Sequence, residues 1–432
     1  MRTRLVVLAS GCLLVGSLQA NAAPNVVTDW ALIAQNTIAP TVALPGQIAY
    51  APLAPIAMYD AAVAIEGGYR AYTTPVIAPA GADLTAAVST AAFRVLHERF
   101  PSAQASLVVQ YADYISGIPD GQAKADGVAV GERVAWQLLA MRAGDGLETC
   151  TGTCSTNPPY VQPSPGPGVF EPFPAGSTPL GASLRAVRPW TMSSADQFRP
   201  EGPSPLASIE YADDWTETRD WGSSTSTLRS AYDDDTARFW QSQTYFQNRD
   251  TLQKAATQYQ LDVVETARLF AMVFAASADG IIGCFDAKYH YLFWRPRHAI
   301  WRADTDGNRG TEPADTTWTP FLPTPNHPEY PAAHACNSYA FFDALHAFFG
   351  GNTPITIETI LPAGPVSTPI RTYTKFNDHR EGDCRCPGAR RDASSSFADE
   401  RSATRTESGE EPGEELFPQD SVDERARSEC RR

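Results

Sequence analysis

The sequence lacks the features that mark membrane-spanning or nucleic-acid-binding chains. Beyond residue 22 it has no uninterrupted apolar run of about 18 residues, so we expect no transmembrane segment in the mature chain. Its 34 Lys and Arg are outnumbered by 49 Asp and Glu, giving a formal net charge of -15. This charge argues against a nucleic-acid partner, because phosphate backbones repel it. A local basic pocket for a small anion stays compatible with it.

Strand-like alternation of apolar and polar residues is also rare, and we find no internal repeat, so an all-α fold is expected. Proline and glycine are dense in residues 150–206, which predicts an ordered but irregular connection. The alternative is a disordered linker, which Phe170, Phe173 and Trp190 disfavour because such residues favour burial. Helical patterns resume near Pro205 and continue to about residue 350. Earlier helical patterns cover residues 27–66, 83–100, 103–118 and 123–142.

The first 22 residues have the pattern of a secretory signal peptide. Arg2 and Arg4 precede an apolar run, Leu5 to Leu18, which is too short to span a bilayer. Ala20-Asn21-Ala22 then supplies a small-x-small cleavage pattern. We therefore expect a secreted or periplasmic protein whose helical domain covers residues 23–380; the alternative is that the first segment forms a buried helix.

Two pairs of cysteines are candidates for disulfides in an exported chain. Cys150 and Cys154 bracket a short Thr-Gly-Thr turn and could pair across it. A zinc site is disfavoured there, because no second Cys or His pair follows at ligand spacing. The sequence leaves open whether either this pair or Cys284 and Cys336 is bonded.

Two cationic residues lie at the end of an apolar, Ala-rich segment, Leu261 to Trp294. Lys288 and Arg295 are seven residues apart, so on a continuous helix they share a face, and Pro296 is expected to end that helix. Two cations on one buried face repel each other unless an anion lies between them. The alternative is a pair of solvated cations whose stems alone are buried.

A second candidate segment, residues 325–335, is a proline-rich turn that leads into an apolar helix over Ala340 to Phe349. A helix start offers free N–H groups and a positive dipole end to an anion. His334 would lie in the first turn, placed to transfer protons to a bound oxyanion. For His327 and His346 a structural hydrogen bond is the simpler interpretation, and the same interpretation applies with less weight to His290 and His298.

Together these segments resemble a known family. Lys-x6-Arg-Pro followed by Pro-x-x-His is similar to the signature of vanadium-dependent haloperoxidases and type 2 phosphatidic acid phosphatases. The sequences of residues 288–296 and 327–334 are most similar to those of the bacterial haloperoxidase-like branch. The resemblance includes residues 165–170 and 194–200 as well as the N-terminal helices. It spans most of residues 25–380, with the active-site part in residues 260–380.

The resemblance implies a helical bundle that holds vanadate, or its near-isostere phosphate, in one pocket. Lys288 and Arg295 match oxyanion ligands, and His334 matches the acid–base histidine. The implied reaction is halide oxidation by hydrogen peroxide, in which Lys288 polarises the bound peroxide. The alternative is an acid phosphatase with a histidine nucleophile, for which His334 protonates the leaving alcohol. Either way the substrates are small molecules.

The chain departs from the family pattern just before His334. The family often has Pro-Ser-Gly-His, in which the Ser hydroxyl donates to the oxyanion. Ala332 and Ala333 replace Ser and Gly here, so that the hydroxyl is lost while the backbone N–H groups remain as cofactor-binding groups.

A metal-binding interpretation also exists for Asp304-Thr-Asp306-Gly307-Asn308, which begins like a calcium loop. Its glycine is at the fourth position rather than the sixth, so the EF-hand spacing fails and a tight surface turn is favoured.

The family's third motif, Arg-x5-His, supplies a further oxyanion-binding Arg and the histidine bonded to vanadium. The chain should reach it soon after Asp378-His379-Arg380, yet no His follows His379. We hypothesise that residues 381–432 are a frameshifted reading of that motif, which leaves the printed chain without its vanadium ligand and nearly inactive. The alternatives are a genuine disordered extension, suggested by its Arg, Glu and Ser content, and a non-catalytic protein that keeps the fold.

The hypothesis predicts the nucleotide sequence near codon 381. Shifted forward by one base, the codon overlapping Pro387 should encode Arg and the codon overlapping Ala393 should encode His, which restores the Arg-x5-His spacing. An early stop in the shifted frame, or a missing His codon, would exclude the frameshift.

Overall fold

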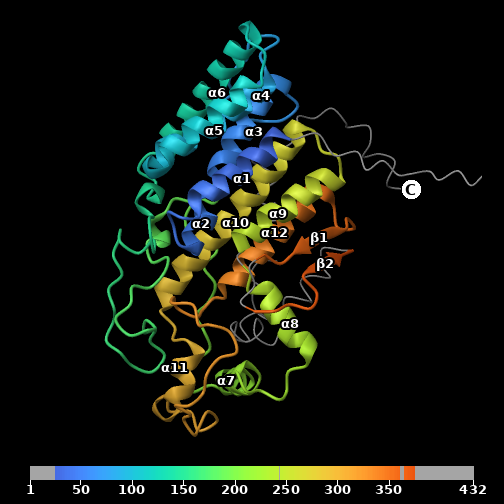
Figure 1. Ribbon diagram of the computed structural model, residues 1–432. Helices are drawn as coiled ribbons and strands as arrows, with labels where there is room; N and C mark the ends of the chain where they lie inside the picture. The colour runs from blue at the N-terminus through green and yellow to red at the C-terminus, as the bar shows by residue number, and fades with distance from the viewer. Residues whose placement is uncertain (1–24, 243, 361–363, 375–432) are drawn as a thin grey trace, which may run out of the picture.

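The computed structural model describes residues 25–242, 244–360 and 364–374, and this part of the chain is mostly helical (Figure 1). The expected signal peptide and the aberrant tail, residues 1–22 and 381–432, lie outside it. Its α-helices are α1 (Val26–Ile38), α2 (Leu44–Tyr50), α3 (Leu53–Glu66), α4 (Leu84–Arg99), α5 (Gln104–Ser116), α6 (Gln122–Met141), α7 (Ile209–Gly222), α8 (Ala231–Trp240), α9 (Thr244–Gln258), α10 (Val263–Tyr291), α11 (Pro296–Trp301) and α12 (Ala333–Phe349).

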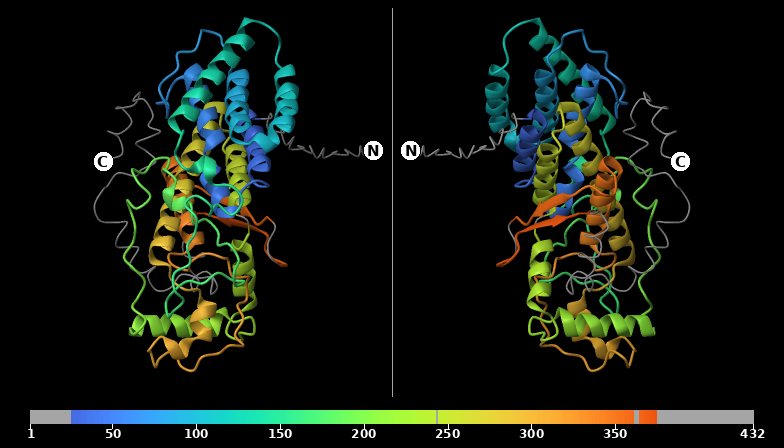
Figure 2. Two further views of the ribbon diagram at one scale, coloured as in Figure 1. Left: turned by 90° about the vertical axis from the view of Figure 1, so that its left-hand side faces the viewer. Right: turned by 90° about the vertical axis from the view of Figure 1, so that its right-hand side faces the viewer.

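Helices α4, α5 and α6 lie at one end of the molecule, and α7 and α11 lie at the other (Figures 1 and 2). The contact between α4 and α6 depends on two glycines of α6. A Cβ at Gly127 would lie 2.3 Å from the carbonyl oxygen of Asp83, and one at Gly131 would lie 2.4 Å from that of Ala87. The absence of side chains therefore lets the two helix backbones touch.

The predicted helical stretch 27–66 is divided into α1, α2 and α3. The breaks fall next to Pro40, Pro45 and Pro52, whose rings remove an N–H donor and block a continuous helix. The expected stop at Gly67 is confirmed, because Gly67 caps α3 with a φ of 72°, a conformation that disfavours side chains.

The long helix α10 is the centre of the fold and packs against α2, α3 and α12. It begins with a capping box, in which Asp262 accepts from the N–H of Glu265 and Glu265 accepts from the N–H of Asp262. Leu44–Glu66 and Val263–Tyr291 are long and apolar enough to cross a membrane, but 83% and 78% of these windows are buried inside the protein. Protein side chains therefore cover most of both apolar surfaces.

Residues 150–206 form an irregular layer without α-helix along α10, and one carboxylate of α10 fixes its course. The carboxylate of Asp279 accepts hydrogen bonds from the backbone N–H groups of Trp190, Thr191 and Met192 at 2.6–2.9 Å. Farther along, the Nε of Arg199 donates to Asp286 at 2.7 Å. The layer is thereby tied to the half of α10 that leads to Lys288.

A small antiparallel hairpin follows the last helix and was not predicted. Strand β1 (Ile355–Glu358) pairs with β2 (Ile370–Tyr373), with Ile355 opposite Tyr373. Ile355 and Ile357 face the core, so the Ile-Thr-Ile-Glu alternation was a strand signal, but only four residues long.

Two disulfides answer the question that the sequence left open. Cys150 is bonded to Cys154, and Cys284 of α10 is bonded to Cys336 of α12. The second bond joins the helix that carries Lys288 to the helix that carries His334. Cys284 lies four residues before Lys288, and Cys336 lies two residues after His334.

The two disulfides should differ in their contribution to stability because they close loops of different length, with sequence separations of 4 and 52. Loop-closure entropy predicts a loss of about 4 kcal/mol for the Cys284→Ala/Cys336→Ala variant and about 2 kcal/mol for the Cys150→Ala/Cys154→Ala variant. Urea unfolding of the unreduced proteins measures both losses. The same unfolding experiment with reductant present measures only the packing cost of replacing Cys by Ala, which is subtracted from each loss. Equal losses for the two variants after this correction would contradict the prediction.

Candidate active site

Lys288 lies in the last turn of α10 and is fully buried, with 0% of its surface exposed. Its ammonium donates to the carbonyl oxygen of Pro328 at 2.8 Å and to that of Glu329 at 2.7 Å. A buried ammonium is costly unless such acceptors surround it. Lys288 therefore joins the end of α10 to the proline-rich segment before His334.

The prediction that Lys288 and Arg295 share one helix face is wrong. Helix α10 ends at Tyr291, and Leu292 adopts the left-handed conformation with a φ of 50°. The backbone of Leu292 to Trp294 then bonds to Gly168 and Phe170 at 3.0 and 2.7 Å, so the chain leaves the helix as an extended strand-like segment. Pro296 begins α11 rather than ending α10. The rigid ring fits a first helical position as well as it blocks an interior one.

Arg295, at the start of α11, is nevertheless buried near Lys288. Its Nη1 lies 2.6 Å from Oε2 of Glu329, and the two side chains are 5% and 7% exposed. Its Nε is buried and has no hydrogen-bond partner among the described residues. The negative charge expected near the two buried cations is therefore supplied in part by the Glu329 carboxylate. The Nε–H of Arg295 is still without an acceptor among the described residues.

The turn-to-helix prediction for the second segment is confirmed, with the helix beginning earlier than Ala340. Helix α12 begins at Ala333, with Ala332 as its N-cap, and no side chain caps it. His334 therefore lies in the first turn, next to backbone N–H groups that have no partner within the helix. The methyl groups of Ala332 and Ala333 cannot donate to an anion, so any donor there is a main-chain N–H.

His327 shows that the predicted residues lie close together. It is 8% exposed, and its Nδ1 lies 3.0 Å from the carbonyl oxygen of Pro328. Burial holds the pKa of His327 well below its ordinary value, and the nearby charges of Lys288, Arg295 and His334 lower it further. The three predicted site residues thus lie within electrostatic range of one imidazole, which makes the structural hydrogen bond expected of it.

Three polar residues near the site were missed or given a different role by sequence reasoning. Glu329 could have been noticed as an acidic residue in an otherwise apolar, proline-rich turn. Asn337, one turn after His334, is 1% exposed, and neither end of its amide has a partner among the described residues. His298 was expected to make a structural hydrogen bond, yet its Nδ1 is buried without a partner in that same part of the chain. Burial lowers the pKa of His298, and the Arg302 charge adds to this effect.

Asp304 to Asn308 forms a tight turn. The N–H of Asn308 donates to the carboxylate of Asp306 at 2.8 Å, and the hydroxyl of Thr311 donates to the same carboxylate. Asp306 is thus occupied by internal donors, as in an ordinary Asx turn.

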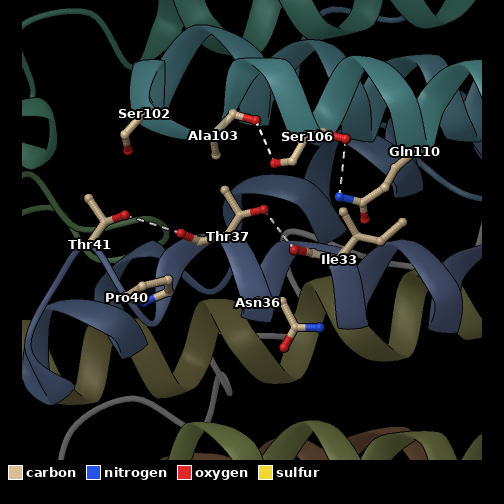
Figure 3. A pocket seen from close by; sticks show the side chains of 9 residues that line it. All are labelled: Ile33, Asn36, Thr37, Pro40, Thr41, Ser102, Ala103, Ser106 and Gln110. Atoms are coloured by element: carbon tan, nitrogen blue, oxygen red, sulfur yellow. Dashed lines mark hydrogen bonds between the residues drawn. The ribbon is translucent and has the colours of Figure 1, made fainter.

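A separate pocket of about 520 Å³ lies between α1 and the start of α5 (Figure 3). No charged side chain lines it. The hydroxyls of Thr37, Thr41 and Ser106 donate to carbonyl oxygens three or four residues earlier in the chain. Since these groups are already satisfied, the pocket has little with which to hold an anion, and the site remains that of Lys288, Arg295 and His334.

Comparison with known proteins agrees with this assignment of the fold. Residues 268–415 match the family model of the VCPO second helical-bundle domain. The first bacterial vanadium-dependent iodoperoxidase structure is 22% identical, with a TM-score of 0.69, over 90% of this chain and 93% of that chain. Apo and holo structures of a bacterial vanadium-dependent chloroperoxidase are 15% and 14% identical, with TM-scores of 0.58 and 0.59. They cover 88% and 91% of this chain, and 90% and 91% of theirs. No curated protein sequence matches significantly.

The lowered pKa of His327 predicts acid sensitivity. Below about pH 6.5 the imidazole is protonated in the unfolded chain but not in the folded chain. The free energy of unfolding therefore decreases as the pH is lowered, by up to about 1.4 kcal/mol per pH unit. His327→Asn should therefore make the slope of stability against pH shallower between about pH 6.5 and 5. Urea unfolding measures the slope. The exposed His290→Asn variant is the control, and a slope unchanged by His327→Asn would contradict the assignment.

Proposed function

Since the chain has the helical-bundle fold of the bacterial vanadium-dependent haloperoxidases and carries the second-domain pattern in residues 268–415, we propose that it is a vanadate-dependent haloperoxidase-like oxidoreductase. It would use hydrogen peroxide to oxidise a halide. The observation that carries the proposal is the buried Arg295, whose Nε has no acceptor in the described part of the chain, close to the buried Lys288.

The residues present fit a tetrahedral oxyanion. A buried guanidinium N–H without an acceptor costs free energy, which an anion would recover through a charge-assisted hydrogen bond. The first turn of α12 adds N–H groups without a side-chain cap. Vanadate, when bound, would supply the Lewis-acid centre that activates peroxide.

Each of the three residues has a separate role in this proposal. Arg295 holds the anion through its unpaired Nε edge. Lys288 contributes a fixed positive charge that stabilises negative charge developing in the pocket. His334, in the first helical turn, exchanges protons with the anion and the reacting groups. The loss of the family Ser at position 332 leaves the main chain of Ala332 and Ala333 to complete the binding site.

Export is proposed as well. The pattern of residues 1–22 and the two disulfides support a secreted or periplasmic location, because disulfides persist in oxidising compartments.

A pair of assays tests the reaction. Under the frameshift hypothesis the chain as it stands should be nearly inactive, whereas a chain that carries the shifted-frame reading of residues 381–432 should brominate dimedone with peroxide only when vanadate is added. Hydrolysis of p-nitrophenyl phosphate should be absent. Hydrolysis that vanadate inhibits would instead support a phosphatase, since vanadate and phosphate are near-isosteric. The absence of both activities would support either a non-catalytic protein with this fold or a chain impaired by its tail. A variant carrying the shifted-frame reading of residues 381–432 distinguishes these two, because it should regain bromination only if the tail was at fault.

Substitution of Arg295 tests the pocket. Arg295→Ala should weaken vanadate binding about ten- to hundredfold, because a hydrogen bond to a charged group contributes about 1.5–3 kcal/mol. His298→Ala is the matched control and should have a far smaller effect, since His298 neighbours Arg295 without being an assigned ligand. Calorimetric titration with vanadate measures both; equal losses would count against this pocket.

A further inference from the structure

Among the described residues, Glu329 is an acidic side chain that forms an ion pair with a candidate oxyanion ligand, Arg295. Its carboxylate lies 2.6 Å from Nη1 of Arg295, in surroundings that leave the two side chains only 7% and 5% exposed. A carboxylate at this depth is tolerated only where a cation and hydrogen bonds compensate its lost hydration. The pair is therefore a fixed feature of the pocket and not a mobile surface contact.

The main chain of Glu329 is fixed as firmly as its side chain. Its carbonyl oxygen accepts from the ammonium of Lys288 at 2.7 Å, and its N–H donates to the carbonyl oxygen of Phe293 at 3.0 Å. One residue thus contacts both cations, Lys288 through the backbone and Arg295 through the carboxylate. Their relative position depends on it, although they lie on different elements.

The guanidinium of Arg295 is planar, so an acceptor on one nitrogen fixes the direction of the other N–H groups. The Glu329 carboxylate is ion-paired with Nη1, while the buried Nε has no acceptor among the residues that the structure describes. We propose that Glu329 is a positioning residue, which orients Arg295 so that its Nε–H donates to the bound oxyanion. The inference rests on the proposed function and adds a residue to it.

This role depends on where an acceptor oxygen lies and not on the negative charge itself. A carboxylate in the pocket even opposes an incoming anion, so a purely electrostatic role would predict tighter binding once the charge is removed. Four variants separate position from charge. Glu329→Gln keeps an oxygen at the same reach without charge, Glu329→Asp keeps the charge but is one methylene shorter, and Glu329→Ala removes both. Glu171→Ala removes the partner of Arg302, a second Glu–Arg pair near α11, and is the matched control.

The experiment is calorimetric titration of the full-length protein and each variant with inorganic phosphate and with orthovanadate. We expect Glu329→Ala and Glu329→Asp to weaken binding about tenfold or more, the range seen when groups that orient ligand residues are removed. Glu329→Gln should restore affinity to within about threefold of the parent, and Glu171→Ala should leave it unchanged. Urea unfolding of every variant verifies that a loss of binding is not a loss of fold.

Three results would overturn the inference. Tighter binding by both Glu329→Gln and Glu329→Ala would make the carboxylate a competitor of the anion. Parent-like binding by Glu329→Asp or Glu329→Ala would remove its positioning role, while the proposed function would stand. Absence of phosphate and vanadate binding both by the parent protein and by a chain that carries the shifted-frame reading of residues 381–432 would overturn the oxyanion site itself, and this inference with it. If Glu329→Ala fails to fold, the contrast between Glu329→Gln and Glu329→Asp decides.

Discussion

Burial of the Lys288 ammonium is the constraint on which the arrangement of the candidate site depends. A charge with no exposed surface needs acceptors, and the carbonyl oxygens of Pro328 and Glu329 provide them. These carbonyls are available because proline-rich backbone has fewer internal hydrogen bonds to make. The end of α10 is thereby joined to the segment that leads into α12, and the Cys284–Cys336 disulfide joins the same two helices covalently.

Local patterns were enough to predict the helices but not the geometry of the two cations. Residues 83–100 and 103–118 were expected to be helical, and α4 and α5 occupy 84–99 and 104–116, because their apolar periodicity and their flanking turns agree. The spacing of Lys288 and Arg295 fits a helix equally well. What ends α10 early is the pairing of residues 292–294 with the backbone of Gly168 to Phe170, a contact about 120 residues away in sequence that no local signal announces.

The same limitation explains why Glu329 was missed. In the sequence it is one acidic residue in His-Pro-Glu-Tyr-Pro, and an exposed turn carboxylate is the ordinary expectation. Its importance appears only when Arg295 lies 2.6 Å away in a buried setting. The prediction that a buried cation pair needs an anion was therefore physically sound, whereas its source was misjudged, because part of the negative charge comes from the protein itself.

The unpaired Nε of Arg295 supports a ligand site because it belongs to a buried cation near Lys288. Arg295 Nε and the amide of Asn337 lack partners within the described residues, and Asn337 lies in α12 three residues after His334. Native interiors rarely leave such groups unpaired, since each costs about 1–3 kcal/mol. By contrast, the hydroxyls that line the pocket beside α1 are already paired. Buried polar atoms without a partner occur elsewhere in the described residues too, among them Trp30 Nε1 and Gln247 Nε2. What distinguishes the candidate site is that the unpaired Nε belongs to a buried cation, Arg295, that lies near a second buried cation, Lys288.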